Sequence, residues 1–430
     1  MRSTLLLAVA FVASLTTGPP QVTLFVASPA DPALVAAVIP RGNINPGGGH
    51  VRPVKHMYLE YLTPRNGGTD SVEIRAMAAG STAMVYHRQE TACLRPVGRD
   101  CSTEPGSTAL IDEYGIWINH RGGVTSYYDH LHELDPGLAI PDWRDPDNGW
   151  VTLGSIHALF FGLNGAPPPS RVRPGDPLGV SRNYFHAWDI GVVDTGVVNA
   201  FLGSGPLRYP SLSELVNQFV AEGGTAAVMS ADEPFPGEAF VNSACFIDGM
   251  TKPLAAVWAA KLLGDGSCGR PDWDLAGTLQ GNWHRSDVTT PTLANMRATE
   301  DNAISFSPYN LDPATQIQIA IGENYFAALP GTIDDTELRI RARLSDGLRL
   351  TPDRTPGALH NPDPANIGIL GYGCYDIPDG PDLHSLLVYH QDTGGGRLRL
   401  LHHASPCSAL LGTVTPANLP GFPWLGTYER

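Results

Sequence analysis

The chain has 430 residues, of which 42% are apolar and 17% charged, and its formal net charge is -15. This length exceeds one compact core and predicts about two or three domains. The acidic and sparse charge argues against a nucleic-acid partner, since phosphate recognition needs clustered Lys and Arg. The 47 Gly and 38 Pro favour short strands joined by turns over a helical bundle.

The N-terminus predicts an export signal. Arg2 precedes an uncharged apolar run at residues 5–15, which is too short to span a bilayer and has the length of a signal-peptide core. We expect a signal peptide within residues 1–30; an uncleaved anchor or a buried strand are the alternatives. No later segment is long and apolar enough to be transmembrane. We therefore expect a secreted, periplasmic or extracellular protein with no stable membrane insertion after signal removal.

Short strands separated by turns dominate the next part of the chain. Residues 71–76, 115–119 and 124–128 have strand-like composition, and Arg121-Gly122-Gly123 joins the last two runs as a hairpin turn. A segment rich in Pro and Asp interrupts the strands at residues 135–170. The pattern predicts a β domain over residues 45–200.

A helical connector is predicted over residues 201–270. Residues 210–222 carry apolar side chains at helical spacing after a capping serine, and a second helix is expected at 253–263, before Gly264.

The last part of the chain returns to strands. Residues 316–321 and 397–401 alternate apolar with polar side chains for most of their length, and residues 386–389 form a continuous apolar run. Gly281-Asn282-Trp283 resembles the start of small antiparallel barrels in which a Trp closes one end. An antiparallel β barrel or sandwich is predicted over residues 271–430.

The six cysteines form three pairs along the sequence. Six cysteines allow 15 connectivities, and nearest-neighbour pairing is the simplest. Disulfides persist in oxidising compartments, which agrees with export. The alternative is a cluster of zinc thiolates, but the chain has no Cys-x-x-Cys. The expected disulfides are Cys93–Cys101, Cys245–Cys268 and Cys374–Cys407.

Four segments of the predicted first domain carry residues capable of chemistry. His56 and Glu60 are four apart, His130 follows a hairpin, a Gly-Asp-Pro-Leu-Gly turn begins at Gly175, and His186 precedes a strand. Catalytic zinc takes three His or carboxylate ligands and keeps a position open for water. The ion lowers the pKa of that water to about 7, and a further His can pass a proton to the leaving amine. These residue types are sufficient for such a site.

The order and spacing of the segments resemble the lysostaphin-type zinc endopeptidases, which share the duplicated-hybrid-motif β fold and cut peptidoglycan cross-bridges. His56 matches the first ligand of the family's His-x-Gly-x-Asp motif, with Tyr58 in place of the Gly and Glu60 in place of the Asp. Tyr128 and His130 match a Tyr-x-His-Leu segment that supplies a catalytic His. The resemblance covers about a third of the chain.

The last family motif, a His-x-His strand, is altered. In one register His186 is catalytic and Trp188 replaces the third ligand, so that only His56 and Glu60 remain. In a shifted register Tyr184 replaces the catalytic residue and His186 is the third ligand. Both registers stay open.

The sequence as a whole predicts a mainly β protein. Its first domain has the duplicated-hybrid-motif fold that the resemblance implies, and a short helical linker and a C-terminal antiparallel β barrel or sandwich follow. It implies an exported zinc endopeptidase that acts on peptidoglycan peptide cross-links, with His56, Glu60 and His186 as metal ligands and His130 and His186 as catalytic residues. The alternative is a catalytically inactive relative that binds cell-envelope glycan or peptide. The oligomeric state is not indicated.

Several other residues have two interpretations. His120, His132 and His157 lie near the motif segments, where hydrogen-bonded or surface histidines are the default. The aromatic residues around the motifs either line a groove for glycan or peptide or pack in the core. They are Trp117, Tyr127, Tyr128, Tyr184, Phe185 and Trp188.

Overall fold

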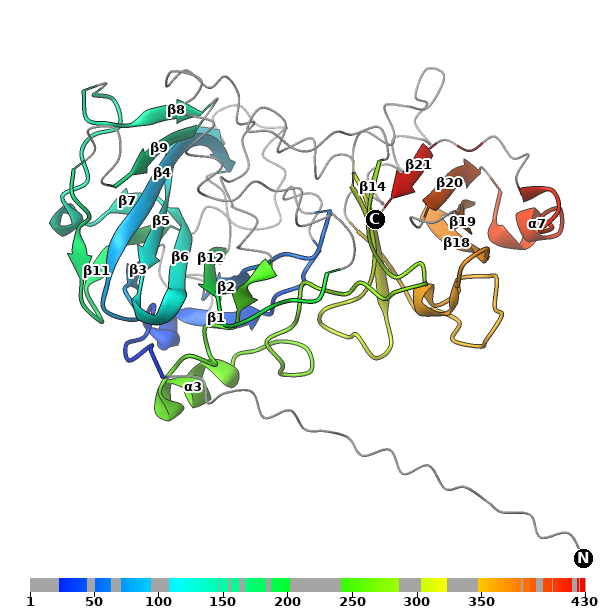
Figure 1. Ribbon diagram of the computed structural model, residues 1–430, viewed down its shortest axis with the longest axis horizontal. Helices are drawn as coiled ribbons and strands as arrows, with labels where there is room; N and C mark the ends of the chain where they lie inside the picture. Colours follow the sequence, from blue (N-terminus) through cyan, green and yellow to red (C-terminus); the bar gives the residue numbers. More distant parts are fainter. Residues whose placement is uncertain are drawn as a thin grey trace, which may run out of the picture.

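The computed structural model arranges the chain as two β-rich lobes that lie side by side (Figure 1). The first lobe contains a ten-stranded and a three-stranded sheet, and the second contains an eight-stranded sheet. The structure describes residues 23–44, 51–62, 71–93, 108–145, 147–153, 156–161, 167–182, 187–201, 241–285, 303–322, 347–379, 382–391, 397–403, 405–419, 424 and 426–429.

The ten-stranded sheet is antiparallel and has the order β1-β2-β12-β6-β5-β4-β9-β8, with β10 beside β4 and β13 beside β12. The predicted insertion at 135–170 includes β8 and β9, which extend this sheet beyond β4. The strands are β1 (Val35–Ile39), β2 (Met57–Tyr61), β4 (Gly80–Cys93), β5 (Thr108–Asn119), β6 (Val124–Leu131), β8 (Val151–Leu153), β9 (Ile156–Phe160), β10 (Arg171–Val172), β12 (Ala187–Asp194) and β13 (Ser243–Ala244).

The three-stranded sheet has the order β3-β11-β7 and contributes to the same hydrophobic core. Its strands are β3 (Ser71–Arg75), β7 (Glu133–Leu134) and β11 (Pro177–Arg182). Val72, Ile74 and Leu178 from this sheet belong to one buried cluster with Leu59 and Ile190 of the larger sheet. Each such side chain contributes about 1.5–3 kcal/mol when fully buried.

The edge strand β1 is covered by the chain that follows the helix α3 (Lys252–Ala259). The amide of Val38 donates to the carbonyl of Lys261, and the amide of Leu263 donates back to Val38. This pairing satisfies backbone groups that would otherwise face solvent at the sheet edge. The predicted helix at 253–263 is present as the shorter α3, whereas the predicted helix at 210–222 lies outside the described residues.

Short helical turns complete the described secondary structure. They are the 3-10 turns η1 (Pro32–Leu34), η5 (Arg121–Gly123), η6 (Pro136–Leu138) and η9 (Pro364–Asn366), and the helix α7 (Cys407–Leu411). None of the helices among the described residues combines the length and the apolar character needed to cross a bilayer.

The second lobe is an eight-stranded antiparallel, barrel-like sheet with the order β17-β16-β15-β14-β21-β20-β19-β18. Its core is built around large aromatic residues, including Trp283, Phe306 and Tyr375, all fully buried. The prediction of a mainly β protein with a C-terminal antiparallel barrel-like sheet is confirmed. The strands are β14 (Gly281–Arg285), β15 (Ala303–Pro308), β16 (Ile317–Ile321), β17 (Leu348–Leu350), β18 (Tyr372–Asp379), β19 (Asp382–Gln391), β20 (Arg397–His403) and β21 (Gly426–Glu429).

Two of the three predicted cysteine pairs are bonded in the structure. Cys245–Cys268 links the residue after β13 to the segment after α3, and Cys374–Cys407 links β18 to α7. The third predicted pair lies outside what the structure describes, because neither the side chain of Cys93 nor any part of Cys101 is described.

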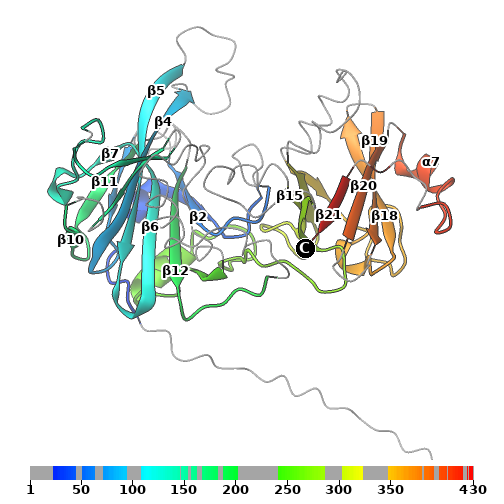
Figure 2. The same ribbon diagram turned by 45° about the horizontal axis from the view of Figure 1, so that its top comes forward.

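The two lobes contact each other through the segment that leads to His56. Ile44 and Val51 pack against Ala303 and Ala320 of the second lobe. The side-chain amide of Gln318 donates to the carbonyl of Ile44 at 3.0 Å. The first lobe and the barrel-like sheet therefore share a buried contact. The paired strands β4 and β5 project from the rest of the first lobe (Figure 2).

Candidate functional site

A row of five ionisable side chains crosses one face of the ten-stranded sheet, and we call it the charge row. Arg88 contacts Glu113 Oε1 through Nε at 2.9 Å and Nη2 at 2.6 Å. The same oxygen lies 3.2 Å from His130 Nδ1, and His130 Nε2 lies 3.3 Å from Asp189 Oδ2. His56 Nε2 lies 3.1 Å from that Asp189 oxygen. The five residues come from β4, β5, β6, β12 and the residue before β2, in the order in which these strands are paired.

A β-bulge brings His130 into the charge row. The register between β5 and β6 shifts between Tyr114 and Ile116, so that Asp129 and His130 both lie opposite Gly115. His130 has a φ of 61°, in the left-handed region that side chains other than Gly rarely adopt. In a regular strand, neighbouring side chains point to opposite faces; the bulge instead lets Asp129 and His130 share one face.

Two glycines make room for side chains beside the charge row. A Cβ at Gly115 would overlap the ring of Tyr86 and the carboxylate of Asp129. A Cβ at Gly191 would overlap the ring of Tyr127. These strand glycines therefore mark close approach of neighbouring side chains to the backbone.

Two carboxylates face each other on β6 and β12. Asp129 is paired in register with Asp189, and both are buried. The hydroxyl of Tyr86 donates to Asp129 Oδ1 at 2.9 Å. Burial, followed by the charge of Asp189, raises the pKa of Asp129 to about 7.

The surroundings of His130 favour the protonated form of its ring. Burial alone would lower the pKa of His130, but the carboxylates of Glu113 and Asp189 outweigh it and raise that pKa well above the usual value. We therefore expect His130 to be an imidazolium at neutral pH, between the carboxyl groups of Glu113 and Asp189. In that state both ring nitrogens of His130 are donors, and the ring is neither a metal ligand nor a general base.

The predicted site residues have different placements. His56 and His130 meet at Asp189. Glu60 lies near the far end of β2, which pairs with β12 without a register shift and places Glu60 opposite Ala187. Because a strand rises about 3.3 Å per residue, positions 56 and 60 are roughly 13 Å apart. No ion pair joins Glu60 to either histidine among the described residues, and His186 and Tyr184 lie outside them.

Sequence reasoning missed Asp189 and considered Trp188 as a substituted ligand. In the structure Trp188 points to the hydrophobic core and is fully buried, whereas Asp189 lies on the opposite face. The signal for Asp189 was that it is the one charged residue among the otherwise apolar residues 187–193, where a charge is buried only with partners.

The remaining histidines near the motifs have hydrogen-bonding roles. His120 bonds the carbonyl of Ala79 at 2.9 Å and the hydroxyl of Ser126 at 2.8 Å. His132 Nδ1 accepts the backbone amide of Arg182 at 2.9 Å. These contacts agree with the default interpretation of both histidines.

The described aromatic residues of the motif region are buried rather than arranged as an open groove. Trp117 stacks on Tyr127 with ring centroids 4.7 Å apart. Tyr128 and Trp188 belong to the hydrophobic core. Tyr184 and Phe185 lie outside the described residues.

Within the described part of the chain, two groups of three donors lie close enough together to share a metal ion. They are Cys245, Asp248 and Cys268, and His360, Asp376 and Cys407. Both groups include disulfide cysteines, and neither includes His56, Glu60 or His130. The described residues of the predicted zinc site therefore do not form a three-ligand cluster.

Comparison with known proteins gives little further information. No family model matches the chain, and no curated protein matches it. Among solved structures, a chain from the "SpoIIQ-SpoIIIAH pore forming complex" is 12% identical, with a TM-score of 0.22. The match covers 41% of this chain and 87% of the other. At this level of similarity it supports no argument about function.

Proposed function

We propose that this chain is exported and that its first lobe is a non-catalytic relative of the lysostaphin-type endopeptidases, which binds cell-envelope peptide or glycan without cleaving it. The observation that carries the proposal is the charge row. It engages both candidate histidines, His56 and His130, as ion-pair partners of one buried carboxylate. Two disulfides support the exported location, since such bonds persist in oxidising compartments.

The donor set argues against a zinc site of the family type. Zinc needs three protein ligands around one point, and regular pairing of β2 with β12 holds Glu60 away from His56. His130 also forms an ion pair with Glu113, which Arg88 contacts in turn, so its ring is engaged with these neighbours and does not face an open coordination position. A buried row of paired charges instead favours a structural role, in which the charges fix the register of five strands.

The second candidate function is the active zinc endopeptidase. It is favoured by the convergence of His56 Nε2 and His130 Nε2 on Asp189 Oδ2, because imidazole and carboxylate are the ligand types that zinc takes. In this case Asp189 would serve as a ligand that the sequence did not indicate, and Glu60, near the far end of β2, would not be a ligand.

Metal content separates the two functions. The full chain is incubated with zinc, freed of excess ion, and analysed by mass spectrometry of the metal beside His56→Ala and the control His157→Ala. His157 lies on β9, outside the charge row. We expect no stoichiometric zinc that depends on His56. One equivalent that is lost in His56→Ala and kept in His157→Ala would overturn the non-catalytic proposal.

Binding is tested with purified peptidoglycan. We expect the chain to sediment with insoluble sacculi and to release no soluble muropeptides or cross-bridge peptides from them. Release of cleaved peptides would support the endopeptidase. Failure to sediment with sacculi would contradict the cell-wall partner.

A further inference from the structure

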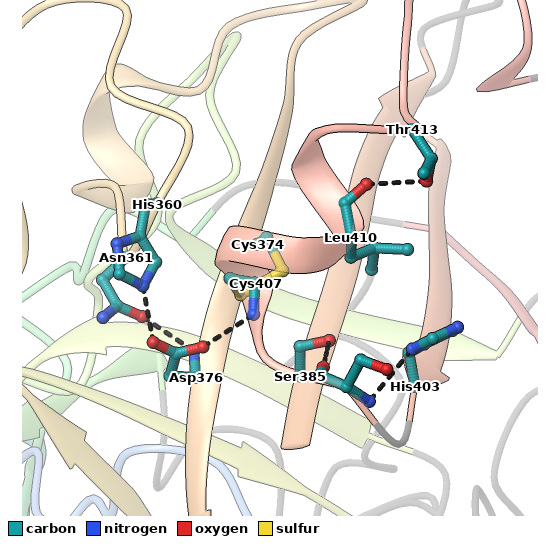
Figure 3. Close-up of a disulfide and its surroundings, with 10 residues drawn as sticks. His360, Asn361, Cys374, Asp376, Ser385, His403, Cys407, Leu410 and Thr413 are labelled. Atoms are coloured by element: carbon teal, nitrogen blue, oxygen red, sulfur yellow. Dashed lines mark hydrogen bonds and ion pairs between the residues drawn. A yellow bond between two sulfur atoms is a disulfide. The ribbon is translucent and has the colours of Figure 1, made fainter. Parts of the chain in front are cut away.

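A histidine and a carboxylate lie beside the disulfide that attaches α7 to the second lobe (Figure 3). His360 Nε2 lies 2.5 Å from Asp376 Oδ2. One ligand atom from each of His360, Asp376 and Cys407 lies within 4.8 Å of the other two. Cys374 is bonded to Cys407, so four groups that can bind a metal gather at this one place.

The backbone holds these four groups in position from three segments. His360 pairs with Cys374 through an isolated parallel bridge. Asp376 lies two residues after Cys374 on β18, so both side chains are on the same face of the strand. The backbone amide of Cys407 donates to Asp376 Oδ1 at 2.9 Å. Asp376 in turn donates its own amide to the side chain of Asn361 at 2.8 Å.

We propose that reduction of Cys374–Cys407 converts this attachment into a zinc site with the ligands Cys374, Cys407, His360 and Asp376. Two thiolates, an imidazole and a carboxylate are all ligands that zinc takes in a tetrahedral site. The group at Cys245, Cys268 and Asp248 includes no histidine and only three donors. This inference does not depend on the proposed function of the first lobe.

The chemical step needs a thiol reductant. Two molecules of a small thiol supply two electrons and become a disulfide, the bond between Cys374 and Cys407 breaks, and each sulfur takes up one proton. Binding of Zn²⁺ then displaces the thiol protons, because only the thiolate is a ligand.

Within the pairs Cys374–Cys407 and His360–Asp376, the movements required for binding are small. With zinc–sulfur bonds of about 2.3 Å, two ligand sulfurs of a tetrahedral site are about 3.7 Å apart, which is also near their contact distance once the covalent bond is gone. With zinc bonds of about 2.0–2.1 Å, the histidine nitrogen and the carboxylate oxygen must separate to about 3.3 Å. The side chain of His360 is 51% exposed, so an ion can reach the site from solvent although both sulfurs are buried.

The test uses the folded full chain before and after treatment with excess dithiothreitol, with thiols counted after the reductant is removed under nitrogen. We expect zinc to bind one to one at this site only after Cys374 and Cys407 are reduced. Cobalt is the spectroscopic probe, because thiolate ligands give it a charge-transfer absorption. A pair that stays oxidised while the chain is folded, or a reduced pair without zinc, would overturn the proposal.

Variants assign the binding to these ligands. His360→Ala and Asp376→Asn should each weaken zinc binding of the reduced chain by at least about tenfold, since each removes a ligand. Asp248→Asn is the matched control, because Asp248 lies beside the other disulfide. Equal losses in Asp248→Asn and His360→Ala, or no loss in His360→Ala, would place the ion elsewhere and refute the assignment.

Discussion

Within the charge row, loss of the Arg88–Glu113 pair should have the clearest effect on the stability of the first lobe. Arg88 is 7% exposed and Glu113 is fully buried. Arg88→Met removes the guanidinium that makes two contacts with Glu113 Oε1, and leaves the carboxylate its ion pair with His130. Breaking a buried pair from one side costs about 3–5 kcal/mol, because the remaining charge is still desolvated.

The size of this effect is measured by calorimetry. For a lobe of this size, about 1 kcal/mol corresponds to a shift of about 2–4 °C in the unfolding midpoint, so Arg88→Met should lower the midpoint of the first lobe by about 10 °C. The double variant Arg88→Met/Glu113→Gln removes both charges and should recover about half of the loss or more. Arg75→Met, in an exposed pair with Glu73, is the control and should cost less than about 1 kcal/mol.

Two results would refute this reasoning. A loss for Arg88→Met as small as that of Arg75→Met would mean that the charge row is solvated. Strictly additive losses in the double variant would mean that Arg88 and Glu113 do not act as a pair.

Three further predictions concern packing, pH and cross-linking. Gly115→Ala should destabilise the first lobe by about 1–3 kcal/mol through overlap, whereas Gly196→Ala should change little; unfolding midpoints decide this. Burial, the main cause, lowers the pKa of His132 to about 4. The unfolded chain therefore binds that proton first, and up to about 3 kcal/mol of stability should be lost as pH falls from 6.5 to 4. His132→Asn should flatten this part of the melting profile. Cys374→Ala/Cys407→Ala should cost the second lobe about 3–4 kcal/mol, given the 33-residue separation, with a smaller change in the first-lobe transition.

Several strands of the first lobe could be predicted from the sequence because their composition is typical of strands and turn residues separate them. The predicted runs at 71–76 and 124–128 lie on β3 and β6, and the predicted run at 115–119 lies on β5, which begins earlier, at Thr108. Period-two patterns report which residues share a face, but they do not report which strands become neighbours. The pairings of β12 with β2 and with β6 join segments that are far apart in the chain.

The candidate site was harder to predict from the sequence, because it depends on which strands become neighbours. The family resemblance drew attention to His56 and His130, which do lie at one place. It did not indicate Asp189, whose role depends on two neighbouring strands. The bulge that turns His130 onto the face of Asp129 depends on pairing with Gly115, and no local pattern in Tyr-Asp-His-Leu encodes that pairing.

The contact between the lobes bears on how the protein can be dissected. Any truncation that ends near residue 270 would strip the cover from Ile44 and Val51 and leave the carbonyl of Ile44 without its partner Gln318. Residues 51–56 are all buried, so the truncation would expose to solvent a surface only a few residues from His56, the first histidine of the charge row. An isolated first lobe would therefore not represent the intact protein. Altered metal or ligand binding by such a fragment could result from the truncation itself as well as from the site.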